Sequence, residues 1–441
     1  MDYQGKQVVI IGLGLTGLSC LDYFLSQGVT PKIVDTRKKP VGIDKLPPEI
    51  EVHVGSLNAQ WLLEADLLVV SPGVAISTPE IKAAIDKGIE VVGDVELFCR
   101  EVNQAKANII AITGSNGKST VTTLVGKMAS SARIKTAVGG NIGLPVLSFL
   151  EDKYDLYVLE LSSFQLETTS SLQAKSATIL NISEDHLDRY SKNLDKYVEA
   201  KQRIYQNATV CIYHEGDIYT HPRHAKPDAK FIEFGEKGCA YRLDKIEGEL
   251  WLIVENEPLI RCSEIKMTGR HNYLNALAAV ALALSAGISK SVCIDTLKHF
   301  NGLPHRFQLV NEAHGIKWIN DSKATNVGSV VAALDGLEIS GTMHLLMGGD
   351  SKSANLMPLA PILRQNNKKV YCFGTDGELI HAISPENSNY YYTMEEAMFA
   401  ARKNAKEGDW IILSPACAST DQFDNYEQRG RVFTEVSYKL A

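Results

Sequence analysis

NIIAITGSNGKST, residues 108–120, joins a short apolar run to a glycine-rich turn and the start of a helix. The run Asn108–Ile112 predicts a buried strand, because it is rich in β-branched residues. Gly114 and Gly117 leave backbone N–H groups free to surround phosphate oxygens, Lys118 adds a positive charge, and the hydroxyls that follow it can ligate Mg²⁺. Ile112 stands where the usual phosphate-loop pattern has its first glycine. The stretch therefore predicts ATP or GTP binding; the alternative is a glycine-rich helix start that binds no ligand.

Short apolar strands alternate with helices on both sides of this loop. The expected strands are Gln7–Ile11, Lys32–Val34, Asp66–Val70, Glu90–Val92, Asn108–Ile112, Asp155–Leu161, Ala177–Ile182, Ile316–Ile319, Thr342–Met347, Lys369–Phe373 and Asp409–Leu413. The expected helices are Leu15–Gln27, Pro79–Lys87, Ser119–Ser131 and Asn193–Tyr205, with a buried helix over 274–286 and short strands and turns over 208–266. This alternation predicts an α/β fold of parallel sheets with helices on both faces.

Two breaks divide the 441 residues into three expected domains. The stretch 93–107 has no clear strand, and KHFNGLP at 298–304 carries glycine and proline after a helix. We expect domains over 1–95, 96–302 and 303–441, with hinges near 95 and 302. The first and third are expected to be Rossmann-like, and the central one to resemble a P-loop ATPase. Ligands are expected where the carboxyl ends of the strands face one another.

A second glycine motif, GLGLTG at 12–17, follows the first expected strand and opens a helix. Its G-x-G-x-x-G spacing lets the backbone approach a pyrophosphate at the helix N-terminus. Asp35 ends the next strand, where an acid can accept a ribose hydroxyl, and Arg37 is either a phosphate or base contact or a solvated surface residue. The motif indicates a nucleotide diphosphate without deciding between NAD and another nucleotide. A tight turn with no ligand is the alternative.

Composition excludes several classes of protein. The chain has 45 Lys+Arg against 52 Asp+Glu, a net charge of −7, which argues against a general nucleic-acid binder. No apolar run is long enough to span a membrane, and the first residues do not resemble a signal peptide. The eight cysteines are scattered without a CxxC pair, as is typical of a reducing cytosol. We expect a cytoplasmic protein with no membrane insertion and no nucleic-acid partner.

Three residues of the central block are candidates for metal chemistry. Glu160 lies near the end of one expected strand and His186 follows another, in the sheet that carries the Lys118 loop. Both are plausible Mg²⁺ ligands; alternatively Glu160 is an ordinary surface acid and His186 is structural. Lys201 lies on an amphipathic helix and by spacing alone is a plain helix residue. A zinc site is not expected at Cys211, His214, His221 and His224, because this segment has no CxxC pair; we expect a polar surface loop there.

Two further patterns lie toward the C-terminus. Asn272 and Asn275 share a helix face, where their amides can bind the edge of an adenine, although polar residues at a helix start explain them equally well. Arg306, Lys323 and Lys352 lie on loops at expected strand ends. Together they would suit a carboxylate and a transferring phosphoryl group, whereas any one of them alone is better explained as solvated.

Several motifs together resemble the Mur ligases, over essentially the whole chain. They are GLGLTG at 12–17, TGSNGKST at 113–120, LELSSFQLE at 159–167, NISEDHLDRY at 181–190, AKQRIY at 200–205, GRHNYLNALAA at 269–279, LPHRF at 303–307, NDSKATN at 320–326 and SPACASTDQF at 414–423. The resemblance implies an ATP- and Mg²⁺-dependent amide ligase of cytoplasmic peptidoglycan precursor synthesis. It implies the branch that adds D-glutamate to UDP-N-acetylmuramoyl-L-alanine through an acyl phosphate, and a monomer is expected.

The resemblance also implies roles for individual residues. The implied ATP-binding residues are Gly114, Ser115, Asn116, Gly117, Lys118, Ser119, Thr120, Asn272, Asn275, Arg306 and Asp321. The implied catalytic residues are Lys118, Glu160, His186 and Lys201, and the implied metal ligands are Ser119, Thr120, Glu160, His186 and Lys201 as its carbamate. The implied uridine-diphosphate site is Leu15, Thr16, Asp35, Thr36, Arg37, Gly73, Asn141 and His186. D-glutamate would meet Thr325, Lys352, Ser419, Thr420 and Tyr426; Thr420 and Tyr426 replace the family's frequent Leu and Phe.

Two other functions fit parts of the sequence. GLGLTG by itself fits a nicotinamide-dependent oxidoreductase, and the Lys118 loop by itself fits a nucleotide-dependent binding or switch module. Phosphate release that requires both proposed ligase substrates would separate the three hypotheses.

Overall fold

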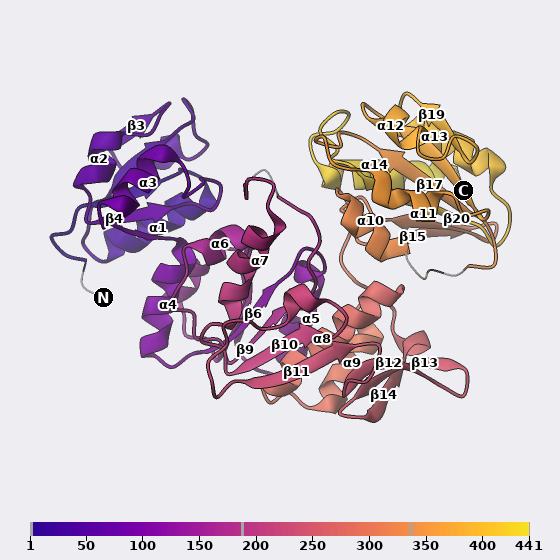
Figure 1. The fold of residues 1–441 in the computed structure, drawn as a ribbon, viewed down its shortest axis with the longest axis horizontal. Coiled ribbons are helices and arrows are strands. Elements are labelled where there is room, and N and C mark those ends of the chain that lie inside the picture. The colour runs from indigo at the N-terminus through magenta and orange to yellow at the C-terminus, as the bar shows by residue number, and fades with distance from the viewer. Residues whose placement is uncertain (1–2, 187–188, 335–336, 338, 441) are drawn as a thin grey trace. The chain divides into compact units, whose positions relative to one another are not determined.

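The computed structural model describes residues 3–186, 189–334, 337 and 339–440 (Figure 1). The chain forms two compact units, one of residues 1–247, 251–259 and 276–296, and one of residues 248–250, 260–275 and 297–441. Within the described residues, no helix combines the length and the apolar character needed to cross a membrane.

The first sheet of the larger unit has five parallel strands in the order β3-β2-β1-β4-β5. Its strands are β1 (Val8–Ile11), β2 (Lys32–Asp35), β3 (Val52–Val54), β4 (Leu67–Val70) and β5 (Glu90–Val92). Its helices are α1 (Leu15–Ser26), α2 (Ala59–Glu64) and α3 (Pro79–Asp86). Strands β1 and β4 are buried at every position, which explains their continuous apolar sequences, as expected for a parallel sheet covered on both faces.

The second sheet carries the phosphate loop and has nine strands in the order β14-β13-β12-β11-β10-β9-β6-β8-β7. Its elements are α4 (Asp94–Gln104), β6 (Asn108–Thr113), α5 (Lys118–Ser131), β7 (Thr136–Gly140), β8 (Leu156–Glu160), α6 (Ser163–Glu167), β9 (Ser176–Ile179), α7 (Leu194–Gln202), β10 (Val210–His214), β11 (Lys230–Gly235) and β12 (Tyr241–Ile246). The chain continues through β13 (Glu249–Val254), β14 (Glu257–Arg261), α8 (Arg270–Ser285) and α9 (Lys290–His299). Strands β6, β8 and β9 pair in parallel, so their carboxyl ends meet at one edge.

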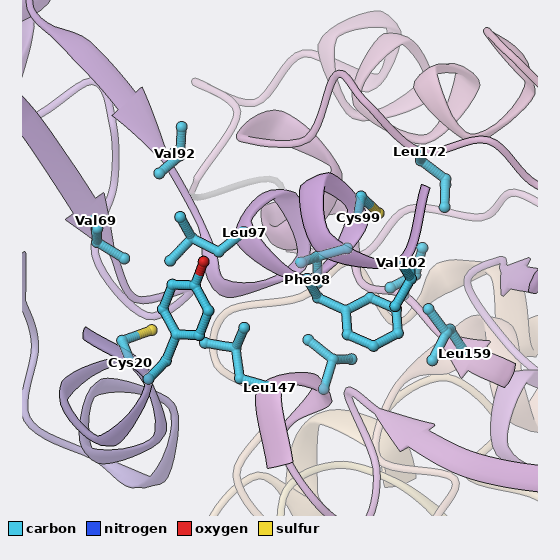
Figure 2. Close-up of a cluster of buried hydrophobic side chains, with 14 of the residues drawn as sticks. Cys20, Val69, Val92, Leu97, Phe98, Cys99, Val102, Leu147, Leu159 and Leu172 are labelled. Atoms are coloured by element: carbon cyan, nitrogen blue, oxygen red, sulfur yellow. The ribbon is translucent and has the colours of Figure 1, made fainter. Parts of the chain in front are cut away.

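Helix α4 joins the cores of these two sheets. Its buried residues include Leu97, Phe98 and Cys99, and one hydrophobic cluster extends from Val69 to Leu159 through them. Figure 2 shows these side chains between the strands of the first sheet and the elements of the second. The stretch 93–107, for which the sequence predicts no strand, is thus a helix packed on both sides.

The smaller unit contains a sheet of six strands in the order β15-β16-β20-β17-β18-β19. Its elements are β15 (Gln308–Ala313), β16 (Ile316–Asn320), α10 (Val327–Leu334), β17 (Met343–Gly348), α11 (Ala360–Leu363), β18 (Lys368–Phe373), α12 (Gly377–His381), β19 (Ser388–Tyr391), α13 (Met394–Asn404), β20 (Trp410–Ala416) and α14 (Tyr426–Lys439). Only β15, at one edge, pairs antiparallel.

The predicted α/β class and the main strands are confirmed, with shifted ends. The expected strand Ala177–Ile182 stops at Ile179, because the residues beyond it turn to contact the phosphate loop. The expected helix Asn193–Tyr205 is α7 followed by a 3-10 turn at Arg203–Tyr205. The buried helix expected at 274–286 begins earlier, as α8.

Candidate active site

The phosphate loop connects β6 to α5 and is shaped by two glycines. Gly114 has φ +151° and Gly117 has φ +83°, conformations that side chains rarely adopt. Gly117 is the N-cap of α5 and has no side chain that could cap the N–H groups of the first helical turn. The loop therefore leads into the positive end of a helix, which suits a phosphate group.

A neighbouring loop holds the phosphate loop in place. The Ser115 N–H donates to the Asn181 carbonyl at 2.9 Å, and the Asn116 N–H donates to the Asn181 side-chain oxygen at 2.9 Å. The Ser115 hydroxyl donates to the Ser183 carbonyl at 3.0 Å. Sequence reasoning assigned no role to Asn181 and Ser183, although they lie in the NISEDHLD segment that it singled out; residues 187 and 188 of that segment lie outside the described residues.

Lys118 and Lys201 converge on this loop. The Lys118 ammonium donates to the carbonyls of Gly114 at 2.9 Å and Ser115 at 3.0 Å. Lys201 reaches the loop from α7 and donates to the Gly114 carbonyl at 3.0 Å and to the Thr113 hydroxyl at 3.1 Å. Lys118 is half-buried, whereas Lys201 is only 1% exposed. Burial, with the charge of Lys118 as a further cause, holds the pKa of Lys201 well below its usual value, which favours the neutral amine.

The position and hydrogen bonding of the Glu160 carboxylate suit the binding of a cation. It ends β8 beside Ile112 of β6, at the sheet edge that carries the phosphate loop, and is 1% exposed. Asn141 donates from its side chain to one carboxylate oxygen at 2.9 Å, and from its backbone to the Glu160 carbonyl at 2.8 Å. The other buried carboxylate oxygen, Oε2, has no hydrogen-bond partner among the described residues. Such an orphaned anionic oxygen suits a hard cation.

The described residues contain no cluster of three or more His, Cys, Asp or Glu side chains that would hold a metal by themselves. His186 is 54% exposed, lies 3.7 Å from Asp185 and packs edge-on against Phe164 at 5.0 Å between ring centroids. The side chains of Ser119 and Thr120 are buried in the first turn of α5. A Mg²⁺ ion here would need oxygen atoms from a bound phosphate or from water, which is common for this ion.

GLGLTG lies at the carboxyl edge of the first sheet. A Cβ on Gly17 would lie 1.9 Å from the Gly12 carbonyl oxygen, so only glycine lets α1 pack this closely. Gly14, the N-cap of α1, has open space around its Cβ position. Leu15 is 72% exposed beside this turn, and Thr16 is half-buried.

Asp35 and Arg37 form a closed pair beside this turn. Asp35 is 3% exposed and accepts the Leu13 N–H at 2.7 Å. The Arg37 guanidinium donates to both carboxylate oxygens, at 2.9 and 2.7 Å. Burial alone would raise the pKa of Asp35, but the bonds from Arg37 and Leu13 outweigh it and lower that pKa. The sequence left Arg37 as either a ligand contact or a solvated residue and did not predict that it binds Asp35. Thr36, between them, is exposed.

The smaller unit holds the remaining candidates. Asn272 and Asn275 are buried on the first turns of α8, and the Asn272 amide donates to the Thr268 carbonyl at 2.8 Å. Asp321 follows β16 and accepts from the Phe307 N–H at 3.1 Å and the Ser414 hydroxyl at 2.8 Å. Burial raises the pKa of Asp321 to about 7. The bond from the Lys323 N–H to the His305 carbonyl, 3.0 Å, brings the Arg306 and Lys323 loops together.

The expected D-glutamate residues lie on loops after β16, β17 and β20. Lys352 has φ +50°, and its N–H donates to Asp350 at 2.8 Å. Ser419 is buried, Thr420 is exposed and Thr325 is half-buried. The Tyr426 ring at the start of α14 lies under the Lys323 ammonium, 4.2 Å from its centroid.

Sequence reasoning missed Arg429, which joins two of these loops. This fully buried residue of α14 donates to the Ser322 carbonyl at 2.9 Å and the Cys417 carbonyl at 3.1 Å. It thereby fixes the NDSKATN segment against the SPACAS segment. The sequence offered one signal for this role: Arg429 lies on the apolar face of an amphipathic helix, with Gly430 and Phe433.

Comparison with known proteins gives consistent matches. Family models match residues 6–93 (Mur ligase MurD-like, N-terminal domain), 112–283 (Mur ligase middle domain) and 305–417 (Mur ligase, glutamate ligase domain). The chain is 56% identical over 440 residues, covering 100% of both chains, to UDP-N-acetylmuramoylalanine--D-glutamate ligase of Escherichia coli (strain K12). The ligase of the same name from Salmonella typhi is 55% identical over the same length.

Solved structures share the fold at lower identity. The MurF ligase of Thermotoga maritima in complex with ADP matches with a TM-score of 0.65 at 16% identity, over 100% of this chain and 97% of that chain. The pseudomurein peptide ligase type C of Methanothermus fervidus matches with a TM-score of 0.64 at 18% identity, over 99% and 100% of the two chains. With the family models and the full-length relatives, these matches confirm the resemblance: the chain belongs to the Mur ligase family.

Proposed function

We propose that this protein is an ATP- and Mg²⁺-dependent ligase that adds D-glutamate to UDP-N-acetylmuramoyl-L-alanine in cytoplasmic peptidoglycan precursor synthesis. The curated relatives that carry this name match over the full length of the chain. The observation that carries the proposal is the convergence of two lysines on the phosphate loop, one of them buried and favoured as the neutral amine. A switch or a dehydrogenase has no need of that second lysine.

The reaction requires an activated carboxylate, because a free carboxylate does not form an amide in water. ATP would phosphorylate the terminal alanine carboxylate, and the amine of D-glutamate would then displace phosphate from the acyl phosphate. Lys118 and the N–H groups of the loop would stabilise the charge on the transferring phosphoryl group. Mg²⁺ would supply further charge neutralisation. Ser119 or Thr120 is proposed to hold one ion together with Glu160, whose Oε2 has no partner among the described residues. His186 and a carbamoylated Lys201 are proposed to hold a second ion.

The substrates would occupy separate surfaces. GLGLTG, Thr36, Gly73 and Asn141 would hold the uridine-diphosphate substrate, with Asp35 and Arg37 at one side. Asn272, Asn275, Arg306 and Asp321 would hold the ATP base, phosphates and ribose. Thr325, Lys352, Ser419, Thr420 and Tyr426 would hold D-glutamate. We further propose a monomeric protein of three domains, 1–95, 96–302 and 303–441, with hinges near 95 and 302 and no nucleic-acid partner.

The test is phosphate release by the purified protein with ATP and Mg²⁺. Release is expected only when both UDP-N-acetylmuramoyl-L-alanine and D-glutamate are present, and the product should gain one glutamate by mass. Each substrate omitted in turn is the control. Release that needs neither amino acid nor UDP-substrate, or a change in NADH absorbance, would contradict the proposal.

A further inference from the structure

Arg189 ties the loop after β4 to the central sheet. Its guanidinium donates to the Pro72 carbonyl at 3.3 Å and to the Val74 carbonyl at 2.9 Å. The loop also contacts GLGLTG, since the Ser71 hydroxyl donates to the Gly12 carbonyl at 3.1 Å. Arg189 therefore holds a segment that borders the expected uridine-diphosphate site.

Two residues of α6 fix the guanidinium itself. Glu167 accepts from Arg189 at 3.0 Å, and each of these two side chains is only 11% exposed. The guanidinium carbon also lies 4.5 Å from the centroid of the Phe164 ring. A charge pair this poorly solvated is weakly screened by salt, and its stacked guanidinium has one preferred orientation. The side chain of Arg189 is thus held in one orientation by α6, the helix that follows Glu160.

The two carbonyls that Arg189 binds flank Gly73. A trans peptide unit is planar, and its N–H points opposite to its C=O. The Pro72 carbonyl and the Gly73 N–H belong to one such unit, so a guanidinium on that oxygen directs the N–H away from Arg189. The Gly73 N–H makes no hydrogen bond to another of the described residues. The Gly73 N–H can therefore donate a hydrogen bond to an acceptor atom of a ligand.

We propose that Arg189 is a positioning residue for the UDP-substrate: it orients the Gly73 amide toward the diphosphate by holding the carbonyls of Pro72 and Val74. This inference rests on the proposed function, because it assigns the diphosphate to that site. Arg189 does not touch the reacting groups. Its loss should therefore weaken binding of the UDP-substrate and leave the affinity for ATP unchanged.

The experiment measures kcat and KM for all three substrates in Arg189→Met and Arg189→Lys. Methionine keeps the length of the side chain and removes every donor, so we expect KM for the UDP-substrate to rise about tenfold or more. Lysine keeps the charge but cannot bind two carbonyls with a planar fork, so a smaller rise is expected. KM for ATP should stay within about twofold in both variants, and calorimetry without ATP should show the same loss of UDP-substrate affinity.

Arg203→Lys is the matched control. The Arg203 guanidinium also donates to two main-chain carbonyls, those of Leu166 at 2.7 Å and Thr169 at 2.8 Å, but both lie in the central sheet region. It should show no selective rise in KM for the UDP-substrate. If Arg189→Met is not recovered folded, Glu167→Gln provides the test, because it removes the charge that holds the guanidinium and leaves Arg189 in place.

The outcomes are distinct. An unchanged KM for the UDP-substrate in Arg189→Met, or in Glu167→Gln where Arg189→Met is not recovered folded, would overturn the positioning role. An equal rise in Arg203→Lys would overturn it as well. A wild-type protein that forms no glutamate adduct would instead overturn the proposed function. A selective rise confined to the Arg189 and Glu167 variants supports the inference.

Discussion

Lys118 and Lys201 donate hydrogen bonds to the same acceptor, the carbonyl oxygen of Gly114, at 2.9 and 3.0 Å. Two ammonium groups that share one acceptor repel each other, and the deeply buried one gives up its proton more easily. This arrangement favours a neutral Lys201 at the pH at which Lys118 is charged. The two lysines therefore have different chemistry although they bind the same atom.

We predict that Lys201 acts as a carbamate. CO₂ would add to the neutral amine, forming one N–C bond and releasing one proton, which converts a donor into an anion with two oxygens. Lys201→Ala should be nearly inactive, and acetate or formate in the buffer should partly restore activity by occupying the vacated position. Lys196→Ala, an exposed residue of the same helix, is the control and should keep its activity. Normal turnover by Lys201→Ala would refute the role.

We predict that Lys118→Met loses phosphoryl transfer and keeps its fold. The lysine starts α5 and is half-buried, and removal of one group that stabilises charge in a transition state typically costs about 10²–10³ in rate. Steady-state phosphate release measures the effect, and circular dichroism checks the fold. Lys127→Met, exposed on the same helix, should behave like the wild type. Activity of Lys118→Met within tenfold of wild type would count against its role.

Gly14→Ala and Gly17→Ala separate binding from folding in GLGLTG. Gly14 has φ −105° and nothing within 4 Å of its Cβ position, so alanine should fold there, but its methyl group would occupy space at the helix N-terminus. We expect weaker binding of the UDP-substrate and little change in the melting temperature. Gly17→Ala places Cβ 1.9 Å from the Gly12 carbonyl oxygen and should cost about 1–3 kcal/mol or more in stability. Titration calorimetry and thermal unfolding measure the two effects.

The same calorimetry compares UDP-N-acetylmuramoyl-L-alanine with NAD⁺ on the wild-type protein. The central phosphate loop already accounts for ATP, so GLGLTG is expected to bind the UDP-substrate. Tighter binding of NAD⁺ would show that the first sheet serves a dinucleotide.

The sequence predicted the features that depend on local spacing. GLGLTG and the Lys118 loop lie at strand ends as expected, because glycine positions and apolar runs are set within a few residues. Helix α4 was not predicted, although its buried residues Val95, Phe98, Cys99 and Val102 recur at helical spacing. These residues pack in one core with residues of two sheets, an arrangement that no local pattern specifies.

The sequence did not predict the contacts between segments that are far apart in the chain. Asp35 binds Arg37, two residues away, and also accepts the N–H of Leu13, which lies 22 residues earlier in the chain. Arg189 binds the loop after β4, and its partner Pro72 lies 117 residues earlier in the chain. The partners of Asp35 and Arg189 are known only from the structure, because the sequence does not show which distant residues lie beside them.

Helix α4 offers two buried carboxylates whose stability effects should have opposite signs. Asp94 is 2% exposed, its Oδ1 has no partner among the described residues, and burial raises its pKa from 3.8 to about 6. Glu96 is 1% exposed and accepts from the Ser170 and Ser171 N–H groups at 2.7 and 2.8 Å. Burial alone would raise the pKa of Glu96, but bonds from Ser171, Ser170 and Arg100 outweigh it and lower that pKa.

The sign of each pH dependence follows from these directions. A raised folded-state pKa means that the Asp94 contribution is fully present below about pH 4 and is lost as the pH rises through about 6. A shift of about two units corresponds to a loss of about 3 kcal/mol, as an order of magnitude. Glu96 behaves in the opposite way: its contribution is present above the unfolded-state pKa of about 4 and is lost as the pH falls through its lower folded-state value.

We therefore predict opposite results for two isosteric variants, followed by the thermal unfolding midpoint between pH 4 and pH 8. Asp94→Asn should raise the midpoint relative to wild type at pH 8, because it removes the cost of ionising a buried carboxyl, and this gain should shrink as the pH falls to 5. Glu96→Gln should lower the midpoint most at pH 8, because it removes a charge that four donor groups of Ser170, Ser171 and Arg100 bind, and the loss should shrink toward pH 4. The variants differ by two positions on one helix, so a general effect of altering α4 would shift both in the same direction. Parallel shifts, or an Asp94→Asn variant that is least stable at pH 8, would contradict the assignment of Asp94 as a buried acid whose ionisation destabilises the fold.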